Sequence, residues 1–389
     1  MSTARAIFRV VRCAVIGLCA VLLSAPPLPA QVSGGGQDAV SGTSGVGMPL
    51  PFPIRVPEGF AVHLLSDKVP GARFIAVAPN GDILISLIGA GRIVAVHPGA
   101  DPGAEPEIVI SGLEKPNALA FRGNDLYVAT WTGVIELADY PHGRAAKVLF
   151  SDMPRNGDHN ARALALGPDG SIYISSGSDC NVCRERDPRL ATVLRYGADG
   201  GQGVIVASGL RNASGLAFDA QGKLWAVVNQ RDNLTPEHRD LPPDELDAIV
   251  EGGDYGWPTA YPDLDGRRRP NPEFPESSTT GFRPSDFPLQ AHSAPLQIAF
   301  YEADAFPPSY RGALFIAFHG SWNRDPPTGY KVVVVRFRDG RPVSIEDFAT
   351  GWRAEGRVLG RPVGLAVSAS GELYVSDDRG YLFGVTYRD

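Results

Sequence analysis

From Phe74 onward the chain repeats one pattern of apolar and polar positions. An alternating apolar run leads into a turn that contains Gly, often beside Asp or Asn, and a second alternating run follows. Alternation with a period of two predicts a strand that buries one face, and the turn residues tolerate the φ angles of a tight hairpin. Six segments show this pattern, and they begin at Phe74, Ala118, Ala163, Gly215, Gln297 and Gly364. Each segment therefore predicts a small antiparallel sheet.

Six such sheets, none able to cover both of its own faces, are best buried by radial packing around a central channel. The sequence thus predicts an all-β fold, a six-bladed β-propeller that spans residues 53–389. The 45 glycines and 34 prolines, spread without a period, agree with many turns between short strands. A β-sandwich is the structural alternative, although six similar hairpin units exceed what it needs.

Residues 233–296 interrupt the repeat with a stretch rich in Pro and Arg, and we interpret them as a loop insertion. Long segments without a strand pattern in a compact domain are often functional, and propellers bind ligands where their loops converge. We therefore expect the insertion to form a wall of the active site.

The N-terminal segment has the composition of an export signal. Arg5, Arg9 and Arg12 precede an apolar run from Cys13 to Leu23, and small residues follow up to Ala30. Residues 1–30 therefore predict a signal peptide and a periplasmic or secreted protein, with an uncleaved anchor as the alternative. Residues 31–52 read as a flexible linker. The rest of the sequence has no apolar stretch long enough for an integral membrane span.

Two cysteines remain after that segment, Cys180 and Cys183. An oxidising compartment favours a disulfide between them, and a zinc site would need a second pair or nearby histidines at the usual spacing. We expect a disulfide that stabilises a loop and takes no part in catalysis.

The formal net charge of -7 provides no basic face for phosphate groups. Nucleic acid is therefore excluded as a partner class, and a small polar molecule is favoured.

Polar clusters stand immediately before or after the predicted strands. His159 and Arg162 precede one strand, and a neutral histidine can take a proton from an alcohol, although a structural histidine is the simpler interpretation. Arg211 and Asn212 precede another strand, where an ion pair between blades is the alternative to a binding role. The run FHGSWNR places further polar groups beside a strong strand, which is costly without a ligand; they are His319, Trp322, Asn323 and Arg324.

Arg73, Arg211 and Arg361 occupy similar places in three repeats, just before the innermost strand. Equivalent positions in different blades converge near the axis of a propeller, so these cations would surround one pocket and favour an anion with several carboxylates. Pyrroloquinoline quinone (PQQ), a tricarboxylate, fits this description.

Several longer motifs carry a family resemblance. GLRN before a blade, NQRDNL followed by LPPDEL, GGDYGWP, and FHGSWNRDPPTGYKV resemble the sorbosone and pyranose dehydrogenases, relatives of soluble quinoprotein glucose dehydrogenase. The resemblance covers the chain from about Val56 to Tyr387. It implies an oxidoreductase that uses PQQ and calcium to oxidise a sugar, sugar alcohol or aldehyde, of the aldose or sorbosone type, and passes electrons to an unknown acceptor.

The resemblance also implies roles for single residues. His159 would be the general base, and Arg211 would polarise the quinone carbonyl. The expected cofactor contacts are Arg73, Arg162, Asn212, His319, Arg324 and Arg361. The backbone carbonyls of Gln230 and Arg231 would bind calcium, at a place where the glucose enzymes have Gly-Pro instead of Arg231 and Asp232.

Two other functions remain open from the sequence. A calcium-dependent lactonase propeller would need acidic and amide side chains at the channel, and inward arginines have the wrong sign for that site. A propeller that only binds proteins or carbohydrate would explain the repeats but not the FHGSWNR cluster.

Overall fold

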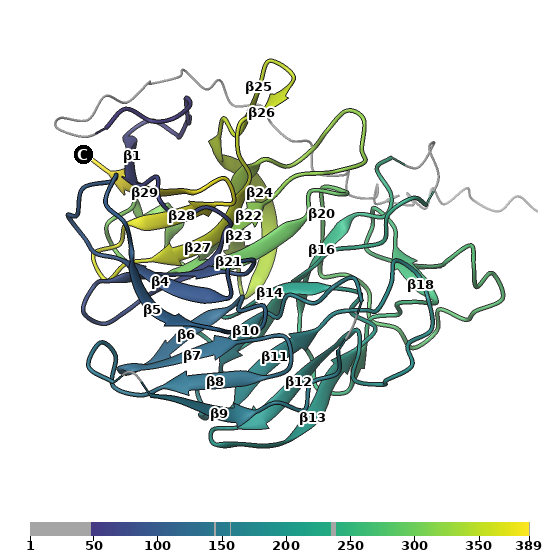
Figure 1. Ribbon diagram of the computed structural model, residues 1–389. Helices are drawn as coiled ribbons and strands as arrows, with labels where there is room; N and C mark the ends of the chain where they lie inside the picture. Colours follow the sequence, from purple (N-terminus) through teal and green to yellow (C-terminus); the bar gives the residue numbers. More distant parts are fainter. Residues whose placement is uncertain (1–47, 144, 156, 235–238, 389) are drawn as a thin grey trace, which may run out of the picture. The chain divides into compact units, whose positions relative to one another are not determined.

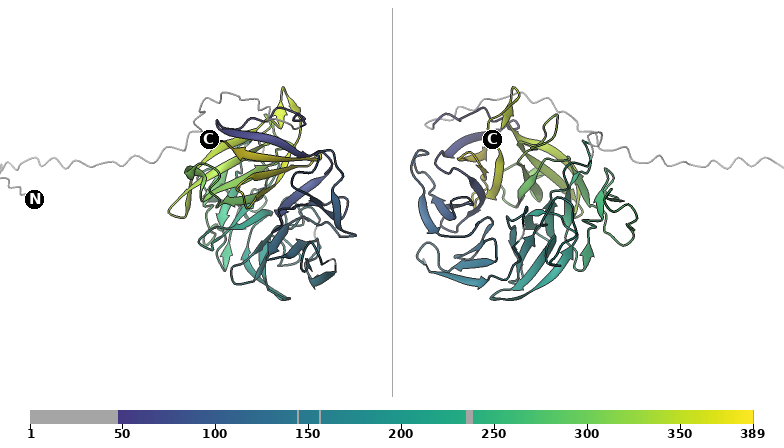
Figure 2. Two further views of the ribbon diagram at one scale, coloured as in Figure 1. Left: turned by 90° about the vertical axis from the view of Figure 1, so that its left-hand side faces the viewer. Right: turned by 45° about the vertical axis from the view of Figure 1, so that its right-hand side comes forward.

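The computed structural model describes residues 48–143, 145–155, 157–234 and 239–388 (Figure 1). Among these residues, six sheets of at least four strands follow one another in chain order around a common centre (Figure 2). The first strand of each sheet packs against the first strand of the next, and the last sheet packs against the first. The predicted six-bladed β-propeller is therefore confirmed.

The first three blades are built from consecutive strands. Blade 1 contains β2 (Ala72–Val77), β3 (Ile83–Leu87), β4 (Arg92–Val96) and β5 (Glu107–Ser111). Blade 2 contains β6 (Leu119–Arg122), β7 (Asp125–Ala129), β8 (Val134–Leu137) and β9 (Ala146–Phe150). Blade 3 contains β10 (Leu164–Leu166), β11 (Ile172–Ser176), β12 (Thr192–Gly197), β13 (Gly200–Ser208) and a parallel edge strand, β17 (Gly253–Asp254).

The other three blades use strands that are further apart in the sequence. Blade 4 contains β14 (Ala213–Phe218), β15 (Leu224–Val228), β16 (Asp244–Ala248) and β20 (Phe287–Leu289). Blade 5 contains β21 (Pro295–Tyr301), β22 (Ala313–Phe318), β23 (Lys331–Arg338) and β24 (Arg341–Thr350). Blade 6 contains β27 (Pro362–Val367), β28 (Leu373–Asp377), β29 (Tyr381–Tyr387) and β1 (Phe60–Ser66).

Three short elements lie outside the six blades. They are the hairpins β18 (Ala260–Pro262) with β19 (Arg268–Pro270) and β25 (Arg353–Ala354) with β26 (Arg357–Val358), and the 3₁₀ helix η2 (Pro308–Tyr310).

Blade 6 closes the ring by combining the two ends of the described chain. Phe60 of β1 lies opposite Tyr387 of β29 in an antiparallel ladder. The sixth repeat in the sequence supplies only three strands, so β1 provides the fourth. Pairing the first strand with the last covers the outer edge of β29 and ties the two ends of the described chain into one blade.

Side chains of the innermost strands tie the blades together near the axis. The amide of Gln297 in blade 5 accepts hydrogen bonds from the backbone N–H groups of Ile75 at 2.9 Å and Leu365 at 3.1 Å. Ser214 of blade 4 donates to the Pro295 carbonyl at 2.5 Å. These bonds satisfy buried backbone groups that no strand ladder reaches and tie together the innermost strands of blades 1, 5 and 6 and of blades 4 and 5.

The prediction that residues 233–296 form an insertion without strands was wrong. β16 and β20 are the third and fourth strands of blade 4. The segment DELDA of β16 is buried throughout, yet three of its five side chains are carboxylates, so its hydropathy does not resemble a buried strand. Arg268 compensates two of them, with Nη2 at 2.7 Å from Glu245 Oε2 and 4.0 Å from Asp247 Oδ2.

The predicted linker boundary also needs correction. Phe52 is 7 % exposed and packs edge-to-face against Trp352 and Phe383, with ring centroids 6.3 and 5.8 Å apart. The packed domain therefore begins before residue 53. The predicted signal peptide and most of the predicted linker lie outside the described residues. Within the described part of the chain, no helix is long and apolar enough to cross a membrane.

Candidate functional site

Most of the predicted site residues lie at one end of the propeller, which we call the site end. In each blade the first strand starts at this end and the second strand finishes there, because the two are antiparallel. Residues before the first strand, such as Arg211 and Arg361, therefore meet residues after the second strand, such as Gln230, His319 and Asp378. This geometry gathers polar loops from all six blades around the axis.

His159 is part-buried and held in one tautomer. Its Nδ1 lies 2.8 Å from Ser178 Oγ, and that hydroxyl donates its single proton to the Cys180 carbonyl at 2.8 Å. Ser178 must then accept from His159, so Nδ1 carries the proton and Nε2 carries the basic lone pair. Burial, followed by the positive charge of Arg211, lowers the pKa of His159 to about 3. The histidine is therefore neutral near pH 7.

Arg211 is 3 % exposed, and its guanidinium is bound to backbone and side-chain oxygens on every side. Nε donates to the Asn181 carbonyl at 3.0 Å, and Nη2 donates to Asn181 Oδ1 at 2.9 Å. Nη1 donates to the carbonyls of Asn229 at 3.1 Å and Gln230 at 2.8 Å. Burial lowers the pKa of Arg211 to about 10, so it stays charged at neutral pH.

Asp232 and Asn212 stand beside this pair. Asp232 Oδ2 lies 3.7 Å from Arg211 Nη2, and Asp232 Oδ1 lies 3.7 Å from His292 Nδ1. Burial acts to raise the pKa of Asp232, but His292 and Arg211 outweigh it and lower the pKa. Asn212 Nδ2 donates to Asn229 Oδ1 at 3.2 Å.

A second cluster joins blades 5, 6 and 1. His319 Nε2 lies 2.9 Å from Asp378 Oδ2. Burial lowers the pKa of His319, and the charges of Arg73 and Arg361 act in the same direction. Arg361 donates to the Gly320 carbonyl at 2.8 Å and lies over the ring of Tyr330. Asp377 Oδ2 also accepts from the Arg361 backbone N–H at 2.7 Å, but burial raises the pKa of Asp377 to about 7, so the two arginines leave the cluster with a small positive charge near neutral pH.

Arg73 is the least satisfied cation of this cluster. Its Nε is buried without a hydrogen-bond partner among the residues that the structure describes, and burial lowers its pKa. A buried guanidinium atom without an acceptor is costly unless a ligand supplies one. Arg324 shows the same feature at Nε, while its other nitrogens bond to the Ala291 carbonyl at 2.9 Å and to Asp240.

The loop 319–324 links the two clusters. His319 belongs to the second cluster, and Trp322 stands close enough to Asp232 of the first cluster to help lower the pKa of that carboxylate. Trp322 is nevertheless 71 % exposed. A large aromatic side chain exposed beside buried charges is suited to contact with a ligand.

The structure gives Arg162 a different place from the one expected. It has no exposed surface, and its donors reach the Trp131 carbonyl at 3.0 Å, the Pro154 carbonyl at 2.6 Å and Ser176 Oγ at 3.1 Å. These bonds join blades 2 and 3. We therefore correct the expected role of Arg162 from cofactor contact to blade packing, because protein atoms cover the whole side chain.

Gln230 and Arg231, whose carbonyls were expected to bind calcium, follow β15 and have different partners. The Gln230 carbonyl already accepts a hydrogen bond from the Arg211 guanidinium, whose positive charge disfavours a cation on the same oxygen. The Arg231 side chain points to the region after β16, where Nη1 donates to Glu273 Oε2 at 2.6 Å and to Asn271 Oδ1 at 3.0 Å.

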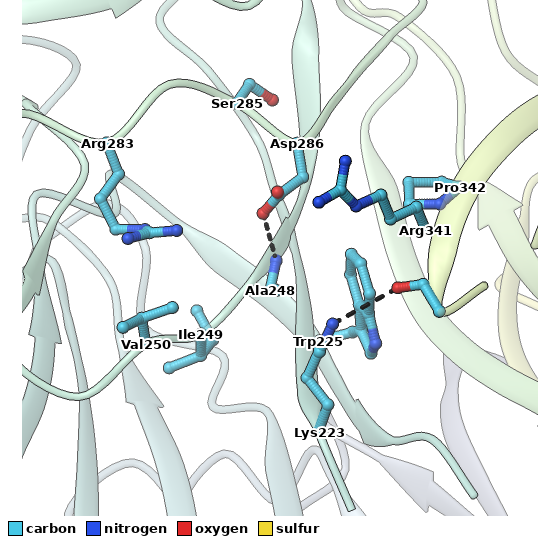
Figure 3. Close-up of a pocket in the computed structure, with 11 residues that line it drawn as sticks. Lys223, Trp225, Ala248, Ile249, Val250, Arg283, Ser285, Asp286, Arg341 and Pro342 are labelled. Carbon is cyan, nitrogen blue, oxygen red and sulfur yellow. Dashed lines mark hydrogen bonds between the residues drawn. The ribbon is translucent and has the colours of Figure 1, made fainter. Parts of the chain in front are cut away.

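The segment between β16 and β20 divides between the two ends of the propeller. Asn271 and Glu273 reach Arg231 at the site end, as just described. At the opposite end, Arg283, Ser285 and Asp286 line a cavity of about 510 Å³ between blades 4 and 5, together with Lys223 and Arg341 (Figure 3). Only part of the predicted insertion therefore stands near the site.

The predicted disulfide between Cys180 and Cys183 is confirmed, with Cα atoms 6.1 Å apart. Sequence reasoning missed the residues around it that contact the predicted catalytic pair, Ser178 and Asn181. It also missed Asp232 and Asp378, although both stand in the motifs NQRDNL and SDDRG beside other polar residues. Their place directly after the second strand of a repeat could have indicated that they lie at the site end.

Comparison with known proteins gives matches over most of the chain. The TrAA12-like family model matches residues 54–388. A PQQ-dependent pyranose dehydrogenase of Coprinopsis cinerea is 30% identical over 277 residues, which cover 56% of this chain and 36% of that protein. An uncharacterised protein of Borreliella burgdorferi is 27% identical over 350 residues, covering 84% of this chain and 89% of the relative.

Solved structures show the same fold. The holo form of the PQQ domain of pyranose dehydrogenase from Coprinopsis cinerea matches with a TM-score of 0.75 and 22% identity, over 86% of this chain and 97% of that one. Since the family model covers nearly the whole propeller, from the residues before β1 to the end of β29, the chain belongs to the TrAA12-like family.

Proposed function

We propose that this protein is a PQQ-dependent dehydrogenase that oxidises a sugar, a sugar alcohol or a related aldehyde. The observation that carries the proposal is the pairing of a neutral, tautomer-fixed histidine, His159, with a set of arginines at the same end of the propeller. The family and the names of the Coprinopsis cinerea relatives support the same reaction class.

The residues present fit an anionic quinone. The buried Nε atoms of Arg73 and Arg324 need acceptors, and carboxylates of PQQ would supply them. Arg361 and His319 stand beside Arg73, so three blades would hold the cofactor. When bound, PQQ supplies the two-electron acceptor for the hydride that leaves the substrate carbon.

The chain itself handles the proton and the charge. His159 would remove the hydroxyl proton of the substrate at Nε2, while Ser178 keeps the ring oriented. Arg211 has its donors directed at protein oxygens, so we propose that its positive charge, rather than a hydrogen bond to the ligand, stabilises negative charge that develops nearby. A lactonase would need a different arrangement, since arginines disfavour a central cation.

Calcium remains a proposal. The Gln230 carbonyl is engaged by Arg211, whereas the Asp232 carboxylate stands close by with a lowered pKa. Hard cations prefer carboxylate and carbonyl oxygens, so Asp232, which directly follows the two expected ligands in the sequence, is an anionic group that could bind calcium.

Reconstitution tests the function. The purified protein is treated with a chelator, dialysed, and titrated with PQQ in the presence or absence of calcium. Aldoses, sorbosone-type aldehydes and sugar alcohols are then screened with an artificial electron acceptor. We expect turnover only with PQQ. Oxidation with a nicotinamide cofactor and no quinone would contradict the proposal, and equal turnover with and without calcium after chelation would remove the metal from it.

A further inference from the structure

The loop closed by the disulfide contacts both residues that we place at the reacting centre. Cys180 and Cys183 enclose only Asn181 and Val182. A four-residue ring of this kind restricts the backbone of the two enclosed residues. The carbonyl and side chain of Asn181 are therefore held at defined positions.

Asn181 binds Arg211 through two oxygens. Its backbone carbonyl accepts from Arg211 Nε at 3.0 Å, and its Oδ1 accepts from Arg211 Nη2 at 2.9 Å. The two bonds grip one edge of the planar guanidinium, and bidentate contacts of this kind fix orientation as well as position. The Asn229 and Gln230 carbonyls hold Nη1, so Asn181 fixes the position of the opposite edge of the buried Arg211 guanidinium.

The same side chain also binds the loop after β15. Asn181 Oδ1 accepts from the Asp232 N–H at 2.9 Å, and Asn181 Nδ2 donates to the Asp232 carbonyl at 2.9 Å. From the other side, the indole N–H of Trp257 donates to the Asn181 carbonyl at 3.4 Å. The amide therefore joins Arg211 to Asp232, and these contacts leave it little freedom.

The first residue of the ring reaches the proposed base. The Cys180 carbonyl accepts the hydroxyl proton of Ser178 at 2.8 Å, and this bond obliges Ser178 Oγ to accept from His159 Nδ1. Two adjacent carbonyls of one small ring thus orient two different groups, His159 through Ser178 and Arg211 directly.

We propose that the disulfide-closed loop is a positioning element of the active site, with Asn181 as the positioning residue for Arg211. This inference rests on the proposed function, and it revises the expectation that the disulfide takes no part in catalysis. The disulfide itself takes no part in electron transfer. It holds the Cys180 and Asn181 carbonyls, which orient His159 through Ser178 and Arg211 directly.

The test compares Asn181→Ala, Asn181→Asp and the Cys180→Ser, Cys183→Ser double variant with Val182→Ala, the matched control inside the same ring. Each is titrated with PQQ by fluorescence and then assayed at saturating quinone. Misplacement of a group by about 1 Å can cost about 10²-fold in rate, so we expect Asn181→Ala and the double variant to lose about 10- to 100-fold in kcat with less change in KM. Asn181→Asp keeps the acceptor for Arg211 and should recover part of the loss.

A second measurement does not depend on turnover. In the apoprotein, the Arg211 Nη2–H that the Asn181 side chain accepts and the Arg211 Nε–H that its backbone carbonyl accepts should both exchange slowly with solvent by NMR. Exchange at Nη2 should become fast in Asn181→Ala, exchange at Nε should become fast in the double variant, and neither should change in Val182→Ala. Wild-type kcat and slow exchange in Asn181→Ala would overturn the positioning proposal. Absence of quinone binding in the wild-type protein, with exchange altered as expected, would instead overturn the proposed function and leave the structural role of Asn181 standing.

Discussion

Gly177 lies so close to His159 that a Cβ atom added to the glycine would stand 2.5 Å from the Cβ of the histidine. The same atom would be 2.6 Å from the His159 carbonyl oxygen and 3.1 Å from Asn212 Oδ1. Non-bonded atoms cannot remain 2.5 or 2.6 Å apart, so either the segment at Gly177 or the segment at His159 must move. Gly177 therefore sets the approach of blade 3 to the proposed base.

We expect Gly177→Ala to displace His159 and to lower kcat by about 10- to 100-fold, because small errors in the position of a base are costly. Overpacking of this kind also destabilises by about 1–3 kcal/mol. Gly89→Ala is the control, since nothing lies within 4 Å of its added Cβ. Turnover assays and thermal unfolding measure the two effects, and unchanged turnover in Gly177→Ala would argue against His159 as the base.

His159→Ala should reduce turnover by about 10²- to 10⁴-fold while PQQ still binds, since a positioned general base contributes about that factor. In the intact protein the base must be deprotonated to act. Burial and Arg211 lower its pKa to about 3, so the neutral form persists as the pH falls through the ordinary histidine range. We expect kcat/KM to stay level well below pH 6.5 on the acid side. An acid limb centred near 6.5 would point to another histidine, with His319 the first to test.

Substitutions of Arg73 and Arg162 should have different effects, the first on cofactor binding and the second on the stability of the fold. Charge-assisted hydrogen bonds contribute about 1.5–3 kcal/mol, so Arg73→Ala should raise the Kd for PQQ by about 10- to 100-fold. Arg162→Met removes the internal hydrogen bonds to the Trp131 and Pro154 carbonyls and to Ser176 Oγ and should lower Tm, with the Kd changed by no more than about twofold. Fluorescence titration and calorimetry make the comparison. The reverse pattern would restore Arg162 as a cofactor contact.

Trp322 offers an exposed aromatic face beside the site, and we expect it to contact the sugar. Trp322→Ala should raise KM by about 10-fold with kcat nearly unchanged, as expected when uniform binding is removed. Trp322→Phe keeps an aromatic ring but loses the indole N–H that helps to lower the pKa of Asp232, so it should retain most of the affinity. Initial rates over a range of sugar concentrations decide this. Equal losses in kcat for both variants would assign the effect to Asp232 instead.

Arg268 compensates the buried carboxylates of β16, and its loss should destabilise blade 4. Removal of one partner of a buried ion pair costs about 3–5 kcal/mol. Burial and the charge of Glu245 raise the pKa of Asp247, and Arg268 opposes this, so the pKa should rise further in Arg268→Ala. A raised carboxyl pKa means that folding stability is lost as the pH increases, so the deficit should grow as the pH rises through the range in which Asp247 of the variant stays protonated. Denaturant unfolding at several pH values measures it. Arg269→Ala is the control, because its ion pair with Asp263 is exposed, and a similar deficit there would contradict the explanation.

The sequence determined the number of blades and the end at which the polar groups gather. Strand alternation is a local property, and six hairpin units with apolar faces can be buried together in few ways, so the propeller could be predicted without coordinates. The sequence also predicted the end of the propeller at which Arg211 and His319 lie. Arg211 precedes a first strand and His319 follows a second strand, and these two positions meet at the same end of a blade.

Tertiary structure decided what each polar residue does. β16 could not be recognised from the sequence, because hydropathy predicts that a segment with three carboxylates is exposed. Its burial depends on Arg268, which belongs to another segment and reaches the carboxylates only in the folded structure. β1 joins blade 6 by pairing with a strand more than 300 residues away. Arg73 and Arg162 look alike in the sequence, yet one has a buried nitrogen without an acceptor and the other is enclosed by protein carbonyls. Hydrogen-bond satisfaction depends on neighbours that only folding brings together.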